Sequence, residues 1–213
     1  MNFKHIPNKK LIEVSKQTKD KKYLSVTGLT GKVSEKAILE WRKKVGEETA
    51  NKIMTESSNR GTSIHNFCEH YLQNESIMIP EQNIPEYYTF KAMKPELNKI
   101  NNIWGLEIPL WSDEYKLKGR PDCIAEYNGV LSMIDFKTSK KVKKKEWIKP
   151  YFLQATAYIE MVKEHTNHQI EQIVLIFGIT NYNITKVEIS KPEHYLLELN
   201  RLNTQFNSSE LSH

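Results

Sequence analysis

The sequence contains few of the residues that build covalent or metal-cluster scaffolds. Of its 213 residues only two are cysteine, Cys68 and Cys123. Two cysteines exclude a disulfide framework and are too few for a four-cysteine iron–sulfur cluster or zinc site. Both lie among apolar neighbours, so we expect both side chains to be buried in the core.

Three further features are missing. There is no apolar run as long as a membrane span, no glycine-rich phosphate-binding loop of the kind that ATP-driven motors use, and no apolar core of a signal peptide near the N-terminus. Residues 1–22 instead carry seven lysines together with Glu13 and Asp20. We expect a flexible basic arm there, no membrane and no ATP among the partners, and a cytoplasmic setting in a bacterium or a virus-infected host cell.

The composition that remains is that of a folded globular protein. Hydrophobic residues make up 38% and charged residues 27% of the chain, and the formal net charge is +5. This length is enough to bury a sizeable core, so we expect a single domain over 23–213. The mildly basic balance permits nucleic-acid binding without requiring it. The sequence does not define the oligomeric state.

Hydrophobic periodicity predicts an α/β domain, a central mixed β-sheet flanked by helices. Helices are expected over about 34–55, 60–73, 86–100 and 146–165, and from Pro192 into a polar tail after Phe206. Strands are expected over 23–27, 104–111, 117–127, 130–138, 173–179 and 184–189. The buried stripe of the first helix is expected to contain Ala37, Ile38, Trp41, Val45 and Ile53.

A tight hairpin near the middle of the chain brings two acids together. Asn128-Gly129 favours a two-residue type I′ turn, which pairs Tyr127 with Val130. Counting outward places Asp122 opposite Asp135, with Lys137 on the same face. Facing carboxylates repel, and a divalent cation between them would stabilise the pair. Salt bridges to Arg120 or Lys137 are the structural alternative, because Arg120 falls opposite Lys137 in the same count.

Other short motifs follow the same order along the chain as in a known family. Asp122, Asp135 and Lys137 match a nuclease core motif, and Gln154 with Tyr158 match a Q-x-x-x-Y helix motif. The segment 60–65, ending in His65 with Glu69 one turn later, is similar to a histidine-bearing helix, and 25–27 to a short opening motif. Over roughly residues 23 to 180 the chain resembles the RecB-like exonuclease branch of the PD-(D/E)xK nuclease superfamily, particularly its small phage and mitochondrial exonuclease-like members.

The resemblance implies a restriction-endonuclease-like core and a Mg²⁺ or Mn²⁺ cofactor. The implied metal ligands are His65, Asp122, Asp135 and the backbone carbonyl of Phe136, with Glu107 as a possible further ligand. Lys137 would orient or deprotonate the attacking water, and Gln154 and Tyr158 would contact that lysine or the DNA. From spacing alone, Gln154 and Tyr158 form one polar helix stripe with Tyr151 a turn earlier, and Glu107 is equally compatible with a structural pair.

The expected function is that of a metal-dependent DNA exonuclease that leaves 5′-phosphates, acting on single-stranded ends. The candidate DNA-binding residues are Arg60, Arg120, Thr138, Ser139, Lys140, Lys141, Tyr151, Gln154 and Tyr158. Lys140 and Lys141 begin a basic run that either contacts phosphate or is simply solvated. A structure-specific endonuclease or resolvase with the same site, and a non-catalytic nucleic-acid-binding module, remain the alternatives.

Overall fold

The computed structural model describes residues 2–210, with backbone alone for 207–210. Its main feature is a five-stranded mixed sheet of order β2-β5-β6-β7-β8. The strands are β2 (Ile100–Leu106), β5 (Cys123–Tyr127), β6 (Val130–Ser139), β7 (Gln172–Ile179) and β8 (Ile184–Ser190). In this sheet only β6 and β7 are parallel, because a helical crossover joins them. Short turns join the antiparallel pairs β5–β6 and β7–β8, whereas the segment between the antiparallel strands β2 and β5 contains two further strands.

A second, three-stranded sheet lies beside the first. Its order is β1-β4-β3, formed by β1 (Leu24–Ser25), β4 (Leu117–Gly119) and β3 (Leu110–Ser112). The expected strands over 104–111 and 117–127 are therefore each divided between the two sheets. The expected strand over 23–27 is shorter than predicted, because the Ser25 side chain accepts a hydrogen bond from the Gly28 backbone N–H and caps a helix.

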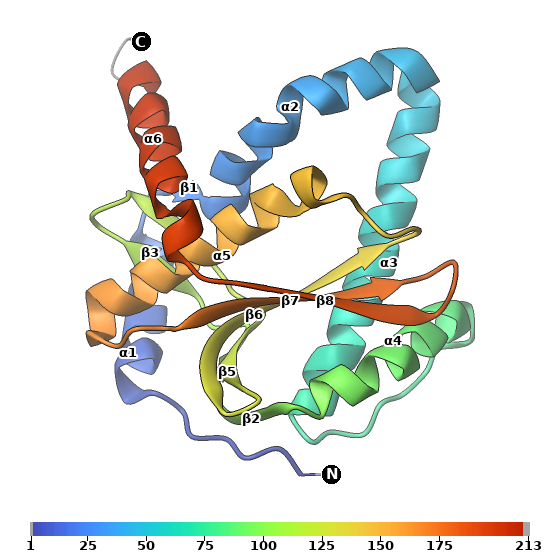
Figure 1. The fold of residues 1–213 in the computed structure, drawn as a ribbon, viewed down its shortest axis with the longest axis horizontal. Helices are drawn as coiled ribbons and strands as arrows, with labels where there is room; N and C mark the ends of the chain where they lie inside the picture. The colour runs from blue at the N-terminus through green and yellow to red at the C-terminus, as the bar shows by residue number, and fades with distance from the viewer. Residues whose placement is uncertain (1, 211–213) are drawn as a thin grey trace.

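Helices cover both faces of the main sheet (Figure 1). The helices are α1 (Lys9–Gln17), α2 (Val26–Val45), α3 (Glu47–Leu72), α4 (Ile84–Leu97), α5 (Lys145–Thr166) and α6 (Glu193–Glu210). Those that pack on the main sheet include α5 on one face and α3 and α4 on the other. Short 3₁₀ turns span Thr18–Asp20 and Glu81–Asn83. The predicted α/β fold with a mixed, helix-flanked sheet is confirmed. None of the helices in this part of the chain has the length and apolar character needed to cross a bilayer.

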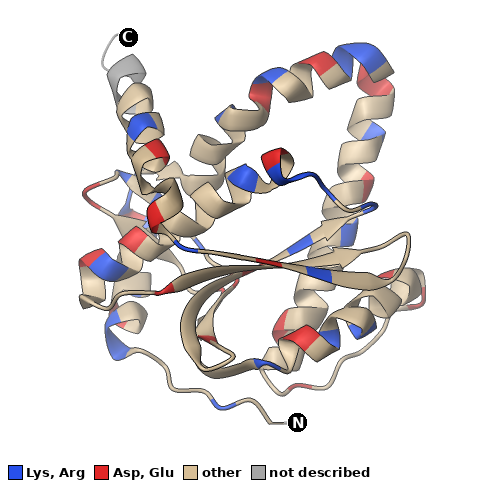
Figure 2. Ribbon diagram, viewed as in Figure 1, with Lys and Arg blue, Asp and Glu red and all other residues tan. Residues whose placement is uncertain are grey.

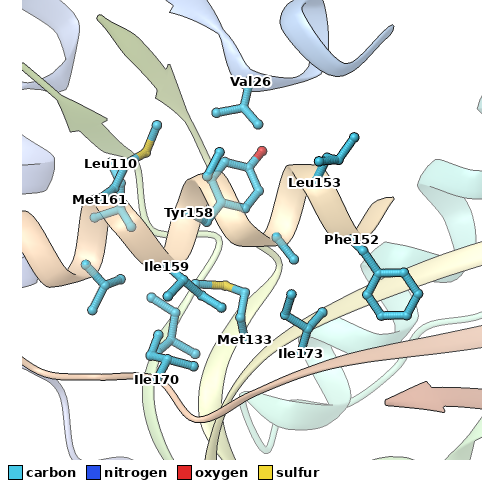
Figure 3. Packing of buried hydrophobic residues seen from close by; sticks show 14 of the residues in the cluster. Val26, Leu110, Met133, Phe152, Leu153, Tyr158, Ile159, Met161, Ile170 and Ile173 are labelled. Carbon is cyan, nitrogen blue, oxygen red and sulfur yellow. The ribbon is translucent and has the colours of Figure 1, made fainter. Parts of the chain in front are cut away.

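Each face of the main sheet has its own hydrophobic core. Ile124, Met133 and Ile173 belong to the core on the α5 side of the sheet. Figure 3 shows Met133 and Ile173 near Ile159 of α5. Their sequence neighbours, such as Cys123 and Ile134, point to the opposite face and pack against α3 and α4. This alternation follows from the two-residue period of a strand. Both cysteines are fully buried, as the sequence predicts.

The prediction of a flexible arm over residues 1–22 is wrong for the part of that segment that the structure describes. Residues 9–17 form α1, whose Leu11 and Val14 are buried, and the Trp111 indole N–H donates to the Val14 carbonyl at 3.2 Å. Before α1, the backbone runs along β2, with the Ile6 N–H donating to the Ile103 carbonyl at 2.8 Å. The many lysines obscured the i, i+3 apolar pair that holds this helix down.

The helix predicted over 34–55 is divided at Gly46, whose φ of 85° ends α2 and begins α3. A left-handed φ suits glycine, which has no Cβ to clash. The predicted buried stripe is also wrong: Ile38 is 40% exposed, Ala37 is exposed as well, and Trp41, Val45 and Ile53 are only partly buried. The outer part of α2 projects away from the sheets with the start of α3 (Figure 1).

At the C-terminal end, the helix predicted from Pro192 is confirmed as α6, but it continues beyond Phe206 to Glu210. The rest of the predicted polar tail, 211–213, lies outside the described residues. The predicted helices over 60–73, 86–100 and 146–165 correspond to the second half of α3, to α4 and to α5. The predicted strands over 173–179 and 184–189 are confirmed as β7 and β8.

Candidate active site

The hairpin register predicted from Asn128-Gly129 is confirmed. Both turn residues have positive φ, 52° and 80°, and the pairing runs from Tyr127 opposite Val130 to Cys123 opposite Ile134. One residue further out, Asp122 lies beside Asp135. The Asp122 Oδ2 accepts a hydrogen bond from the Phe136 backbone N–H at 2.6 Å. The two-residue turn therefore brings the two acids together at the same end of β5 and β6.

Asp135 and Lys137 form an ion pair beneath the surface. Lys137 Nζ lies 2.6 Å from Asp135 Oδ2, and their side chains are 17% and 4% exposed. Burial raises the pKa of Asp135 above its usual value, although the Lys137 charge opposes it. Burial alone would lower the pKa of Lys137, but the carboxylates of Asp135 and Asp122 outweigh that and hold it above its usual value. The salt bridge that the sequence offered as an alternative to a metal site therefore forms between Asp135 and Lys137. Arg120 does not take part, because it pairs with Glu107 instead.

A second group of ligand atoms comes from three separate elements. His65, Glu107 and Asp122 each offer an atom within 4.8 Å of the other two, and His65 Nδ1 lies 3.5 Å from Asp122 Oδ2. α3 supplies the histidine by passing close to the end of β6: a Cβ on Gly61 would lie 3.7 Å from Thr138 Oγ1. The helix predicted to carry His65 therefore does bring it to the acids.

Glu107 does not lie in mid-strand as predicted, because β2 ends at Leu106. Its φ of 49° is left-handed, which is uncommon for a residue with a side chain. Its backbone N–H donates to the Asp122 carbonyl at 3.0 Å, and its Oε2 lies 2.8 Å from Arg120 Nε. Burial, and then the charge of Asp122, raise the pKa of Glu107 to about 7. Backbone strain of this kind is often found at functional sites.

The donor set fits a divalent cation. Imidazole nitrogen and carboxylate oxygens are ligands that Mn²⁺ and, for the oxygens, Mg²⁺ accept. Asp135 Oδ2 is buried, and no hydrogen bond of normal geometry reaches it from residues 2–210. Its contact is the ion pair with Lys137. The compact group contains Glu107 rather than Asp135, which lies deeper against the lysine. The Phe136 carbonyl as a ligand stays a prediction.

A cavity of about 350 Å³ opens at this group. Its lining consists of Gly61, Thr62, His65, Asn66, Glu69, Glu107 and Arg120. The sequence analysis does not include Thr62 and Asn66 among the site residues. Their spacing could have identified them, since they lie four residues apart on α3, on either side of His65 in the sequence. Glu69, one turn after His65, also reaches the cavity, and its Oε1 accepts a hydrogen bond from the Gln73 amide at 3.0 Å.

Gln154 and Tyr158 lie on the other side of the acids. The Gln154 amide nitrogen lies 3.4 Å from the Tyr158 hydroxyl, and Tyr158 is only 3% exposed. Burial raises the pKa of Tyr158 to about 12, with the charges of Asp135 and Lys137 also acting on it. Tyr151 is a turn earlier, and the Lys137 ammonium lies 5.0 Å from its ring centre. Tyr151 and Tyr158 of α5 therefore lie near the buried lysine, and Gln154 contacts Tyr158.

Of the predicted DNA-binding residues, Lys140 and Lys141 are exposed on the segment after β6, whereas Tyr158 is buried. Lysines gather on the segment that joins β6 to α5 (Figure 2). Within it, Lys140 lies 4.0 Å from Glu56 of α3, and the Ser139 hydroxyl donates to the Lys141 carbonyl at 2.6 Å. Arg60 donates to Ser57 at 3.1 Å, while its Nε is buried without a partner in the part of the chain that the structure describes.

A test of the Glu107 environment follows from its pKa. The folded-state pKa of about 7 lies above the usual 4.5, so ionised Glu107 destabilises the fold, fully above pH 7 and not at all below about pH 4.5. In metal-free buffer, we expect Glu107→Gln to raise the free energy of unfolding at pH 8 by on the order of 2 kcal/mol and to change it little near pH 4.5. Thermal melts at both pH values measure this, and an equal effect at both would contradict it.

The mixed sheet, with acids and a lysine at one end of its central hairpin, places the fold in the restriction-endonuclease-like class of nucleases. A comparison with models of protein families supports this independently. The PD-(D/E)XK nuclease superfamily matches residues 82–207, more than half of the chain, and the chain belongs to that superfamily. The match includes Asp122, Asp135 and Lys137, whereas His65 precedes it.

Two curated proteins are similar to parts of the chain. Mitochondrial genome maintenance exonuclease 1 of Mus musculus is 30% identical over 106 residues, which are 46% of this chain and 31% of that protein. The protein of the same name from Homo sapiens is 26% identical over 131 residues, which are 60% of this chain and 38% of that protein. The chain thus spans under two fifths of the length of either relative.

Proposed function

We propose that this nuclease is a Mg²⁺- or Mn²⁺-dependent DNA exonuclease that acts on single-stranded ends and leaves 5′-phosphates. The observation that carries the proposal is the buried Asp135–Lys137 ion pair beside the His65, Glu107 and Asp122 ligand group. A buried lysine next to a cation site is suited to phosphodiester hydrolysis, in which negative charge develops on phosphate. The exonuclease name of both similar proteins supports the choice of reaction mode.

The metal would be held by His65, Asp122 and Glu107, with Asp135 on the side of the lysine. A bound divalent ion supplies a nucleophile near neutral pH and neutralises charge on the phosphate oxygens. Asp135 and Asp122 hold the pKa of Lys137 above its usual value in the absence of metal. Its ammonium would act on the phosphate side by stabilising the negative charge that develops there. Tyr158, which Gln154 contacts, would lie beside the lysine on the α5 side of the site.

The substrate backbone would be bound at the rim. Arg60 of α3 and the exposed lysines of the β6–α5 segment lie near one another, since Lys140 is 4.0 Å from Glu56 of α3 and a Cβ on Gly61 would lie 3.7 Å from Thr138 Oγ1. Neighbouring positive groups on these two elements suit the phosphate backbone of a single strand that follows them into the site. Phosphate contacts of this kind position the chain without reading its sequence, so we expect little sequence preference.

The test uses linear and circular DNA, each single- and double-stranded, with the linear forms labelled at either end. We expect Mg²⁺- or Mn²⁺-dependent release of mononucleotides or short oligonucleotides from linear single strands, and survival of circles. Products that ligate without prior phosphorylation identify 5′-phosphates. Cleavage of circular substrates would replace the exonuclease proposal by the endonuclease alternative, and no cleavage with either ion would overturn the proposal altogether.

The rim lysines make a separate prediction. Replacing Lys140, Lys141 and Lys144 with Ala should weaken single-stranded DNA binding and lower the slope of log affinity against log salt by about 2, at roughly 0.7 per lost phosphate contact. The measurement is fluorescence anisotropy in EDTA at several salt concentrations. The matched control replaces three exposed lysines of the remote helix α1, Lys9, Lys10 and Lys16, which changes the net charge equally. Equal loss in both variants would show that only overall charge matters.

A further inference from the structure

The two edges of the five-stranded sheet differ in how they are covered. Along the β2 edge the chain covers its own strand: the Ile103 N–H donates to the Lys4 carbonyl, and the N–H groups of Ile6 and Asn8 donate to the carbonyls of Ile103 and Trp104. β2 is also irregular, with a register shift between Asn101 and Gly105. Covering and bulging are two ways of preventing a strand edge from pairing with another chain.

The β8 edge has neither protection. β8 pairs with β7 over seven consecutive residues without a bulge, from Ile184 opposite Ile179 to Ser190 opposite Ile173. Among residues 2–210, no hydrogen bond reaches the N–H and C=O groups of its outer edge. No residue of β8 is fully buried, whereas seven of the eight in β7 are. In Figure 1 β8 crosses the front of the molecule with no other element drawn over it.

The charged side chains of β8 are arranged so that two antiparallel copies of the strand would be complementary. Lys186 and Glu188 flank Val187 and share one face of the strand, where their charged groups are 2.6 Å apart. If a second β8 pairs antiparallel about Val187, each Lys186 falls directly opposite the other copy's Glu188. Opposite charges at directly facing positions stabilise a strand pair. Ile184 and Ile189, 47% and 52% exposed, would be shielded near the ends of this pairing.

From this self-complementarity we propose that β8 is the dimer interface of the protein, where two copies pair antiparallel about Val187 to form one continuous ten-stranded sheet. A two-fold axis through Val187 makes the contact isologous, so that each copy contributes the same surface. The four charges of the two copies alternate in sign. Each Lys186 ammonium would lie beside the Glu188 carboxylate of its own strand and opposite that of the other copy. The inference is independent of the proposed nuclease activity.

Charge reversal separates this interface from any other. A single strand pair is a small interface, so we expect a reversible dimer with a Kd on the order of 10–100 µM. Lys186→Glu and Glu188→Lys each place like charges opposite one another twice in the dimer, and each should weaken association about tenfold or more. The double variant Lys186→Glu/Glu188→Lys restores both opposite-charge pairs and should associate as the wild type does.

Mixing the two single variants gives the most specific readout. A Lys186→Glu chain carries two acids and a Glu188→Lys chain two lysines at these positions, so the two should form a heterodimer although each alone is monomeric. Analytical ultracentrifugation at several concentrations, with circular dichroism melts to show that each variant is folded, measures all four proteins and the mixture. A wild type that stays monomeric at about 500 µM, or a dimer that the single reversals leave unchanged, would overturn the proposal.

Discussion

Lys137→Ala should lower the rate of DNA cleavage by about 10²–10³-fold while leaving DNA binding nearly unchanged. The Lys137 ammonium is buried beside the acids and lies 2.6 Å from Asp135 Oδ2, where it can stabilise charge that develops on the phosphate only during the reaction. Its side chain is 17% exposed, so it contributes little to the binding surface. Single-turnover cleavage with Mg²⁺ or Mn²⁺ gives the rate, and anisotropy in EDTA gives the binding.

The same substitution affects stability, because it leaves Asp135 buried without its counter-charge. Breaking a buried pair from one side is expected to destabilise by about 3–5 kcal/mol. Lys137→Ala/Asp135→Asn removes both charges and should recover most of the lost thermal stability but none of the activity. This double variant separates catalysis from folding. Wild-type cleavage by folded Lys137→Ala would contradict the proposed role of the lysine.

The part of the site that the sequence predicts best is the hairpin, because a two-residue turn determines register completely. Once Asn128-Gly129 is identified as the turn, the positions of Asp122, Asp135 and Lys137 follow by counting in steps of two. The places of His65 and Tyr158 in the site do not follow from the turn, because neither spacing nor composition links α3 or α5 to the hairpin. Their motif resemblance supplied that link, and the structure places both near the acids.

The errors have one physical origin, which is that tertiary contacts override local patterns. The Leu11 and Val14 pair of α1 is a weak signal in a lysine-rich segment, and only its packing against the β3 region makes it a helix of the core. The apolar residues of α2 suggested a buried stripe, but Gly46 turns the chain so that this part of the helix projects from the sheets. The sequence predicts Glu107 within a strand, because no local signal indicates the left-handed φ with which the chain leaves β2 there.

Gly119→Ala should impair the protein most among single-methyl additions near the site. A Cβ at Gly119 would lie 2.6 Å from Tyr158 Cε1 and 3.0 Å from the Tyr158 hydroxyl oxygen, closer than real side chains approach. The Tyr158 ring cannot yield easily, since it is 3% exposed and packs among core residues such as Val26 and Leu110 (Figure 3). We expect a loss of about 1–3 kcal/mol in the free energy of unfolding.

The loss in activity should exceed what the stability change explains. β4 ends at Gly119 and Asp122 follows three residues later, so any displacement that relieves the clash moves either Asp122, the proposed metal ligand, or Tyr158 beside the lysine. A displacement near 1 Å costs on the order of 10²-fold in rate. We therefore expect cleavage by folded Gly119→Ala, measured well below its melting temperature, to fall by about that factor.

Gly31 offers the matched control, because a Cβ there meets no atom within 4 Å and the residue lies inside α2. Gly31→Ala should raise stability by about 0.5–1 kcal/mol and leave cleavage unchanged, since alanine loses less entropy than glycine in a helix. Adding Tyr158→Leu to Gly119→Ala removes the clashing ring and should restore stability without restoring activity. If Gly119→Ala instead cleaves DNA as fast as the wild type, Tyr158 and Asp122 do not depend on their close packing, and the α5 wall of the site is not part of the catalytic geometry.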